Sequence, residues 1–147
     1  MFCFALYFGV GVSALSQILK DNIALKELSF YKNNLGNDGV KALGDGLRAN
    51  KTLVNLTLTK NDIYDEGAIA FLKCLAGAES LRWLDLAQNM ITGASGAAIC
   101  DCLESNQALT ELMLDGNDIP TEGNFFDLLF SIFFFVAIFK KILIKYR

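Results

Sequence analysis

Few side chains in this 147-residue chain are suited to acid–base or nucleophilic chemistry. The sequence contains no histidine, which excludes Ser-His-Asp and Cys-His nucleophiles, histidine-ligated zinc and the usual proton shuttle. No two of the four cysteines, Cys3, Cys74, Cys100 and Cys102, form a C-x-x-C pair, and Cys100 with Cys102 is a weak metal signal. We therefore predict that the protein is not an enzyme and holds no cofactor or metal.

The acidic residues and glycines form no ligand-binding motif either. Neither G-x-x-x-x-G-K-S/T nor a G-x-G-x-x-G following a strand is present, so no phosphate-binding loop is predicted. Two acidic groups lack the spacing of an EF-hand calcium loop, and their recurrence favours roles in loops and at helix starts. These groups are Asp62, Asp65 and Glu66, and Asp115, Asp118 and Glu122.

The elements that position these side chains follow an internal repeat of 28 residues. At that offset the chain aligns in four copies of the unit L-x-x-L-x-L-x-x-N-x-L, and the spacing does not vary. The aligned sets are Leu25, Leu53, Leu81 and Leu109; Leu28, Leu56, Leu84 and Leu112; Phe30, Leu58, Leu86 and Leu114; Asn33, Asn61, Asn89 and Asn117; and Leu35, Ile63, Ile91 and Ile119.

Each part of the unit predicts a local structure. The last two leucines alternate with polar residues, which predicts a short strand with one face turned inward. The asparagine that follows can hydrogen-bond the turn backbone, so the four aligned asparagines predict a structural ladder from coil to coil. The second half of the unit has helical spacing, as in Val40, Leu43 and Leu47. Cys74 and Cys102 share one helical position, which favours buried reduced thiols over a disulfide.

This pattern closely resembles the ribonuclease-inhibitor-like class of leucine-rich repeats over residues 11–123. Members of that family stack one strand and one helix per repeat into a horseshoe, with a concave parallel sheet and convex helices. The resemblance therefore implies an α/β solenoid, or horseshoe segment, for this chain. The family includes the ribonuclease inhibitor, NOD-like receptors, the Ran GTPase-activating protein and tropomodulin-like actin regulators, so it indicates the fold better than the function.

The amino-terminal end continues the repeat less well than the middle does. Of the 12 phenylalanines, three lie in residues 1–8 and seven in residues 124–147. Residues 1–10 are interpreted as part of a cut repeat, because Phe2 falls on the Phe30 position at the same offset. A signal peptide is the alternative for residues 1–12, but the stretch lacks a basic segment and runs directly into the repeat.

The apolar and basic tail, residues 124–147, does not fit the repeat. Lys140 falls on a core leucine position, so no further repeat is expected. A C-terminal apolar helix is predicted instead, as a cap on the last coil or as a membrane span. The span needs about 20 apolar residues, which residues 125–144 supply only by including three charged residues. A truncated or mis-spliced end is the third interpretation.

Side chains between the buried leucines are expected on the concave face, because side chains alternate along a strand. Exposed aromatic residues there are typical of interface hot spots. Trp83, the only tryptophan, is either such an anchor or a partly buried filler against Thr57 or Met113. The predicted partner-binding residues are Tyr31, Asn55, Thr57, Thr59, Trp83, Asp85, Glu111, Met113 and Asp115.

The charge distribution suggests which partners this face would accept. Residues 25–123 contain eight lysines and arginines against 14 acids, a net charge of −6, whereas residues 124–147 carry +3. Such a face favours a basic protein partner over nucleic acid. We predict a protein–protein interaction scaffold. The alternatives are a regulator of an enzyme, of the GTPase-activator or ribonuclease-inhibitor type, and a membrane-anchored receptor fragment. We expect a cytoplasmic location, with membrane association through residues 125–144 as the alternative.

Overall fold

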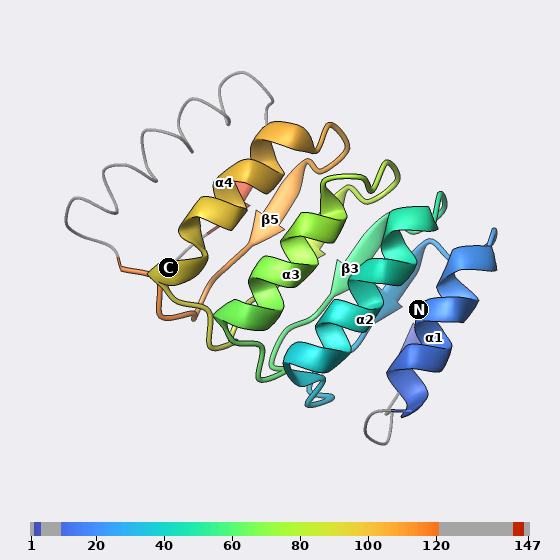
Figure 1. Cartoon of the computed structure of the whole chain (residues 1–147), viewed down its shortest axis with the longest axis horizontal. Coiled ribbons are helices and arrows are strands. Elements are labelled where there is room, and N and C mark those ends of the chain that lie inside the picture. Colours follow the sequence, from blue (N-terminus) through green and yellow to red (C-terminus); the bar gives the residue numbers. More distant parts are fainter. Residues whose placement is uncertain (1, 4–9, 121–142, 146–147) are drawn as a thin grey trace.

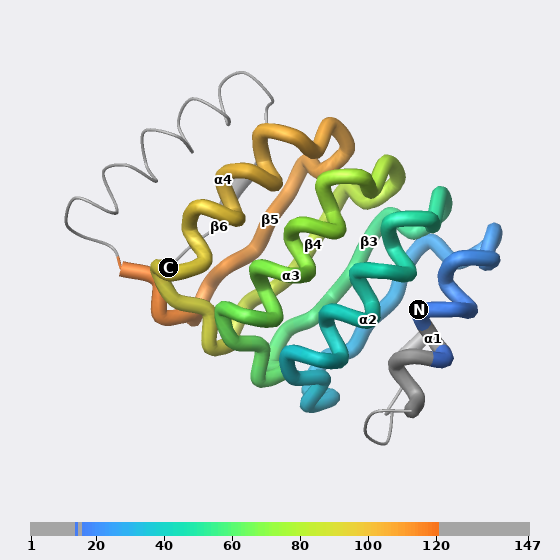
Figure 2. Tube along the Cα trace, viewed as in Figure 1, coloured from blue at the N-terminus to red at the C-terminus, as the bar shows by residue number. Residues whose placement is uncertain are grey.

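The computed structural model describes residues 2–3, 10–120 and 143–145. Strands and helices alternate along the chain, and the strands join one parallel sheet in the order β1-β2-β3-β4-β5-β6. The four helices lie side by side over one face of that sheet (Figure 1). Figure 2 shows the same stack as a trace, in which each coil follows the previous one. The predicted α/β solenoid with a parallel sheet and one layer of helices is confirmed.

Each coil consists of a very short strand and a longer helix. The elements are β1 (Phe2–Cys3), α1 (Val10–Asp21), β2 (Glu27–Ser29), α2 (Gly36–Ala49), β3 (Asn55–Thr57), α3 (Asp65–Leu75), β4 (Trp83–Asp85), the 3-10 turn η1 (Gly93–Ser95), α4 (Gly96–Ser105), β5 (Glu111–Met113) and β6 (Leu143–Lys145). The strands lie where the repeat unit predicts them, and each contributes one central leucine to the core in β2–β5.

The 28-residue spacing sets the register of the sheet. Leu28, Leu56, Leu84 and Leu112 pair in succession across β2–β5, and all four are buried. Leucines stacked in this way form one continuous core between the strands and the helices, because each coil buries its apolar face only against its neighbours. The helices complete the core from the other side, with side chains such as Phe71, which is fully buried.

The outermost strands depart from that register. In β1, Phe2 pairs with Leu28 and not with Phe30, because the connection from this strand to its helix is two residues shorter than in the next coil. In β6, Ile144 pairs with Leu112, an offset of 32 residues. A further repeat strand therefore follows β5, contrary to the sequence-based expectation.

The predicted C-terminal apolar helix is not supported. Leu143 and Ile144, which the proposed 125–144 span included, form a strand because they pair with β5. Residues 121–142, on which the capping and membrane-span interpretations rest, lie outside the described residues. Among the helices of the described ranges, none is long and apolar enough to cross a membrane.

A row of asparagines binds the coils together where the strands end. We call Asn33, Asn61, Asn89 and Asn117 the strand-exit ladder. Asn61 is fully buried; its Nδ2 donates to the carbonyl of Phe30 at 2.8 Å, and its Oδ1 accepts from the backbone N–H of Asn33 at 3.1 Å. Asn89 repeats this pattern one coil later. The residue before each ladder asparagine is left-handed: Lys32, Lys60, Gln88 and Gly116 have φ between 53° and 70°.

A second asparagine set lies where the helices end. We call Asn22, Asn50 and Asn106 the helix-exit set. The Nδ2 of Asn50 donates to the carbonyl of Leu19 at 2.6 Å, and its Oδ1 accepts from the backbone N–H of Leu53 at 2.7 Å. In the third coil the equivalent position is Ala78, and Ser80 Oγ donates to the carbonyl of Asn50 at 3.3 Å instead.

Candidate functional site

The open sheet face, opposite the helices, carries its side chains in three rows that cross the strands. Register places the members of the first two rows beside one another. The first row is Glu27, Asn55, Trp83 and Glu111; the second is Ser29, Thr57, Asp85 and Met113; the third, just beyond the strands, is Tyr31, Thr59, Ala87 and Asp115. All nine predicted partner-binding residues therefore fall on this side of the sheet.

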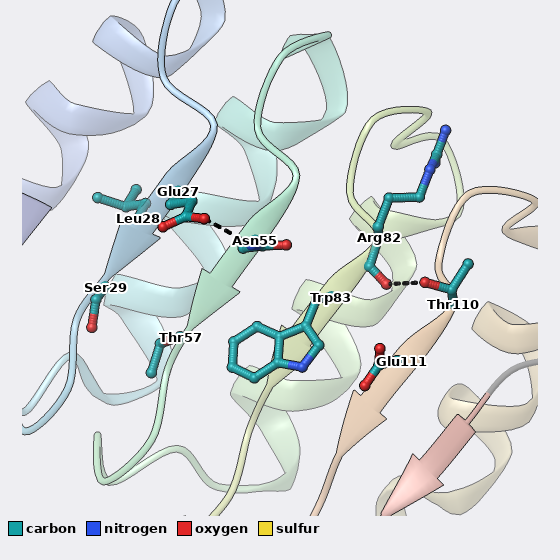
Figure 3. A pocket seen from close by; sticks show the side chains of 9 residues that line it. All are labelled: Glu27, Leu28, Ser29, Asn55, Thr57, Arg82, Trp83, Thr110 and Glu111. Carbon is teal, nitrogen blue, oxygen red and sulfur yellow. Dashed lines mark hydrogen bonds between the residues drawn. The ribbon is translucent and has the colours of Figure 1, made fainter. Parts of the chain in front are cut away.

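A hollow of about 420 Å³ opens on this face around the first row (Figure 3). Its lining is mostly polar, and Trp83 is the one aromatic residue in it. The lining residues are Glu27, Leu28, Ser29, Asn55, Thr57, Arg82, Trp83, Thr110 and Glu111. Because the strands are parallel and in register, the hollow is formed by four successive coils and requires all of them to be stacked.

Trp83 lies in the middle of the hollow and is only partly buried. Register places Asn55 on one side of it and Glu111 on the other, and its indole lies across the sheet between Thr57 and Glu111 (Figure 3). The two alternatives for Trp83 thus both hold in part, because the ring packs on the sheet and still presents a face to solvent.

The edge of the hollow at the amino ends of the strands is held by a polar network. Arg82 Nη1 donates to the carbonyls of Glu79 at 3.1 Å and Ala108 at 3.0 Å, and the hydroxyl of Thr110 donates to the carbonyl of Arg82 at 3.0 Å. The guanidinium of Arg82 therefore points away from Trp83 (Figure 3), and its charge is engaged with loop carbonyls.

The third row has a different character. Tyr31 is 45% exposed, and the ammonium groups of Lys32 and Lys60 lie 5.5 Å and 6.0 Å from the centre of its ring, within the range of cation–π attraction. Thr59 is buried, contrary to its predicted place on the exposed surface. Its backbone carbonyl accepts from Lys32 N–H and from the Asn61 amide, so neighbouring coils close around it.

Four carboxylates lie on the open sheet face, and no described side chain neutralises them. Glu27 accepts a hydrogen bond of 3.2 Å from Asn55 Nδ2, and Asp85 accepts one of 2.8 Å from the backbone N–H of Ala87. Among the described side chains, Glu27, Asp85, Glu111 and Asp115 form no ion pair, since the ion pair found joins Lys51 to Glu79. The hollow is thus lined by negative charge.

The cysteines offer no reactive or metal-binding centre in the part of the chain that the structure describes. Cys74, Cys100 and Cys102 are buried and in no disulfide. Burial, with the carboxylates of Glu104 and Asp101 nearby, raises the pKa of Cys100 to about 11, and burial together with Asp45 raises the pKa of Cys74. The described residues contain no group of three histidine, cysteine or acidic side chains able to hold a metal ion.

Sequence reasoning missed two residues of the hollow, Arg82 and Thr110. Both lie immediately before a strand, at positions whose side chains the strand alternation does not describe. Their recurrence at the same repeat position as Lys26 and Val54 was visible, but not which of these four side chains would turn toward the sheet.

Comparisons with known proteins identify the repeats. A family model described as leucine-rich repeat matches residues 21–44 and 49–72. Among solved structures, actin-binding site 2 of leiomodin-1 is similar, with a TM-score of 0.76 and 18% identity, over 96% of this chain and 81% of that one. The C-terminal domain of Caenorhabditis elegans tropomodulin has a TM-score of 0.77 and 16% identity, over 92% of this chain and 82% of that one. No curated protein sequence matches the chain significantly.

These similarities establish leucine-rich repeats and the α/β solenoid fold. At 16–18% identity they carry the fold and no more. The two family matches cover α1's end through α3, and the unchanged register extends the same repeat to β5.

Proposed function

We propose that this leucine-rich-repeat chain is a non-enzymatic protein-binding module that engages its partner through the open sheet face. The observation that carries the proposal is Trp83, a large aromatic side chain left partly exposed at the centre of a hollow. Tryptophan is among the residues that dominate binding energy when a partner covers them, and such anchors lie near the centre of an interface. The surrounding polar rows would form the rim.

We infer that the partner presents a basic surface. The carboxylates on the open sheet face attract positive charge and repel the phosphates of nucleic acids. They are not neutralised by described lysines or arginines, so their charge is available to a partner. Electrostatic complementarity of this kind speeds association and suppresses wrong partners more than it raises affinity.

We also infer a ribonuclease-inhibitor-like class of repeat and a cytoplasmic location. The class is supported by the 28-residue period and by the long helices, such as the 14-residue α2, that alternate with the strands. The location is supported by the free thiols of Cys74 and Cys100, since disulfides are typical of oxidising compartments.

Actin is the first defined partner to test. The similar domain of leiomodin-1 is described as an actin-binding site, and a purified protein allows an affinity to be measured. A second arm uses proteins recovered from a cell lysate on the immobilised chain, so that a partner other than actin is also found.

The test compares variants of the open sheet face with variants of the helices. Trp83→Ala and Asp85→Ala remove side chains of the first two rows, whereas Lys41→Ala and Glu66→Ala remove exposed side chains of α2 and α3. We expect Trp83→Ala to weaken partner binding by about tenfold or more, as hot-spot truncations do, and the helix variants to leave it unchanged. Unchanged binding by both sheet variants, or loss only with the helix variants, would contradict the proposal.

A further inference from the structure

We propose that the hollow around Trp83 binds an arginine side chain of the partner, with its guanidinium stacked on the indole and paired with Glu111. This inference rests on the proposed function and names the group that its site would recognise. The juxtaposition that carries it is an indole face beside two carboxylates, Glu27 and Glu111, in a hollow of about 420 Å³.

The lining of the hollow selects a cationic occupant over an apolar one. An apolar side chain on Trp83 would shield Glu27 and Glu111 from water and leave both carboxylates unpaired, which costs free energy. A cation placed over the indole is attracted by the ring and by both carboxylates. The neutral members of the lining, Asn55 and Thr57, can hydrogen-bond such a group without opposing its charge.

No described side chain of the protein already fills this role. Arg82, the one cationic residue of the lining, directs its guanidinium to the carbonyls of Glu79 and Ala108. Lys32 and Lys60 lie at the ring of Tyr31, in the third row. Among the described residues Glu111 therefore has no cationic partner, and the indole of Trp83 has no cation over its face.

The geometry favours arginine over lysine. A guanidinium is planar, so it stacks on an indole with its flat face while its edge donates two parallel hydrogen bonds to a carboxylate. Glu111 neighbours Trp83 in the register of β4 and β5, which places a carboxylate at the edge of the stacked position. An ammonium group is a more strongly hydrated point charge and satisfies only one of these two requirements at a time.

Trp83 itself reports on the test, because it is the only tryptophan of the chain. The probe is the peptide acetyl-Gly-Arg-Gly-amide, titrated into the full chain while the fluorescence of Trp83 is recorded. Peptides with lysine or glutamine in place of arginine are the matched probes, and N-acetyltryptophanamide measures collisional effects. We expect a saturable change with the arginine peptide, about fivefold weaker binding of the lysine peptide, and no saturable change with the glutamine peptide.

Charge variants locate the binding. Glu111→Gln and Glu27→Gln should each weaken arginine-peptide binding about threefold to tenfold, and added salt should weaken it further. Glu66→Gln, an equal change of charge on the helix side, should leave it unchanged. Trp83→Phe keeps an aromatic face, and calorimetry should detect weaker but measurable binding. Circular dichroism checks that each variant is folded.

A non-saturable response, or a response that Glu111→Gln leaves intact, would overturn the arginine site. The two proposals fail separately. If the partner depends on Trp83 but the arginine peptide does not bind, the protein-binding function stands and the arginine site is wrong. If the peptide binds but Trp83→Ala keeps the partner, the partner does not use the open sheet face.

Discussion

Asparagine side chains join the coils at both ends of the repeat, but the two ends depend on them differently. Every described coil has its asparagine in the strand-exit ladder, where the preceding residue is left-handed each time. In the helix-exit set the third coil has Ala78 in place of asparagine, and the turn is closed by backbone hydrogen bonds from Gly77 N–H to Cys74 and from Ala78 N–H to Leu75.

The difference shows what a repeat position tolerates. At the strand exit the backbone turns too sharply to satisfy its own polar groups, so an amide that both donates and accepts is needed in each coil. At the helix exit a helix can end in a turn that bonds its own carbonyls, and the asparagine adds a link between coils without being the only way to close the chain.

The largest expected effect is that of Asn61→Ala in the strand-exit ladder. Asn61 donates to Phe30 and Thr59 and accepts from Asn33 and Leu35, so its loss leaves buried backbone groups unpaired. We expect a loss of about 3 to 5 kcal/mol in the free energy of unfolding, or failure to fold, measured by urea denaturation. Gln107→Ala, an exposed amide, is the control. A loss below that of the helix-exit variants would reverse the comparison.

Asn106→Ala in the helix-exit set should have a smaller effect. Asn106 donates to the carbonyls of Leu75 and Ala78 and accepts from the backbone N–H groups of Ala108 and Leu109. Because a helix terminus can bond its own carbonyls once the amide is gone, we expect about 2 to 3 kcal/mol in the same denaturation experiment. A loss equal to that of Asn61→Ala would show that both ends depend on asparagine alike.

A third link between coils is charged and separates itself from the amide links by pH. Thr92 and Ser95 donate to the carboxylate of Asp65. Burial alone raises the pKa of Asp65, but the hydrogen bonds from Ser95 and Thr92 outweigh it and hold the pKa below its ordinary value of 3.8. The carboxylate therefore stabilises the fold fully above about pH 3.8, and this contribution is lost as the pH falls through the lowered pKa.

The Asp65→Asn variant isolates that contribution. At pH 7 we expect it to be less stable than the natural chain by about 1 to 2 kcal/mol, and the difference should shrink as the pH falls below 3.8. Denaturation curves at several pH values measure it. Asn106→Ala, which removes a neutral amide, should keep its deficit across the same range. A pH-independent deficit in Asp65→Asn would mean that the ionised carboxylate is not what joins these coils.

The smallest effect is expected where the helix-exit set is interrupted. Ser80 makes a single bond of 3.3 Å to the carbonyl of Asn50 and is only partly buried. Ser80→Ala should cost about 0.5 to 1 kcal/mol by thermal denaturation. A loss as large as that of Asn106→Ala would show that Ser80 replaces the missing asparagine in full.

Much of this molecule followed from spacing. The register of β2–β5 and the burial of Leu56 and Leu84 follow from a constant 28-residue offset, because identical coils stack in one way. The strand-exit asparagines were recognisable because they recur at every coil. The outer strands were not, since Phe2 and Ile144 pair at offsets of 26 and 32 residues, outside the period.

The candidate site was predictable in its position and not in its shape. Trp83, Asp85 and Glu111 face the open side of the sheet as alternation requires. Thr59 follows the same rule, yet it is buried, and Arg82 borders the hollow from a position that the rule does not cover. Burial and side-chain direction depend on neighbours in adjacent coils, which a period does not specify.

By itself, then, the sequence determined the repeat, the parallel sheet, the side of it that each strand residue faces and the acidic balance of that side. Tertiary structure alone decided that four coils enclose a hollow around Trp83 and that Arg82 turns its charge away to two loop carbonyls. The reason is physical: backbone stacking follows from local periodicity, whereas an unpaired carboxylate beside an open indole depends on where side chains 28 residues apart come to rest.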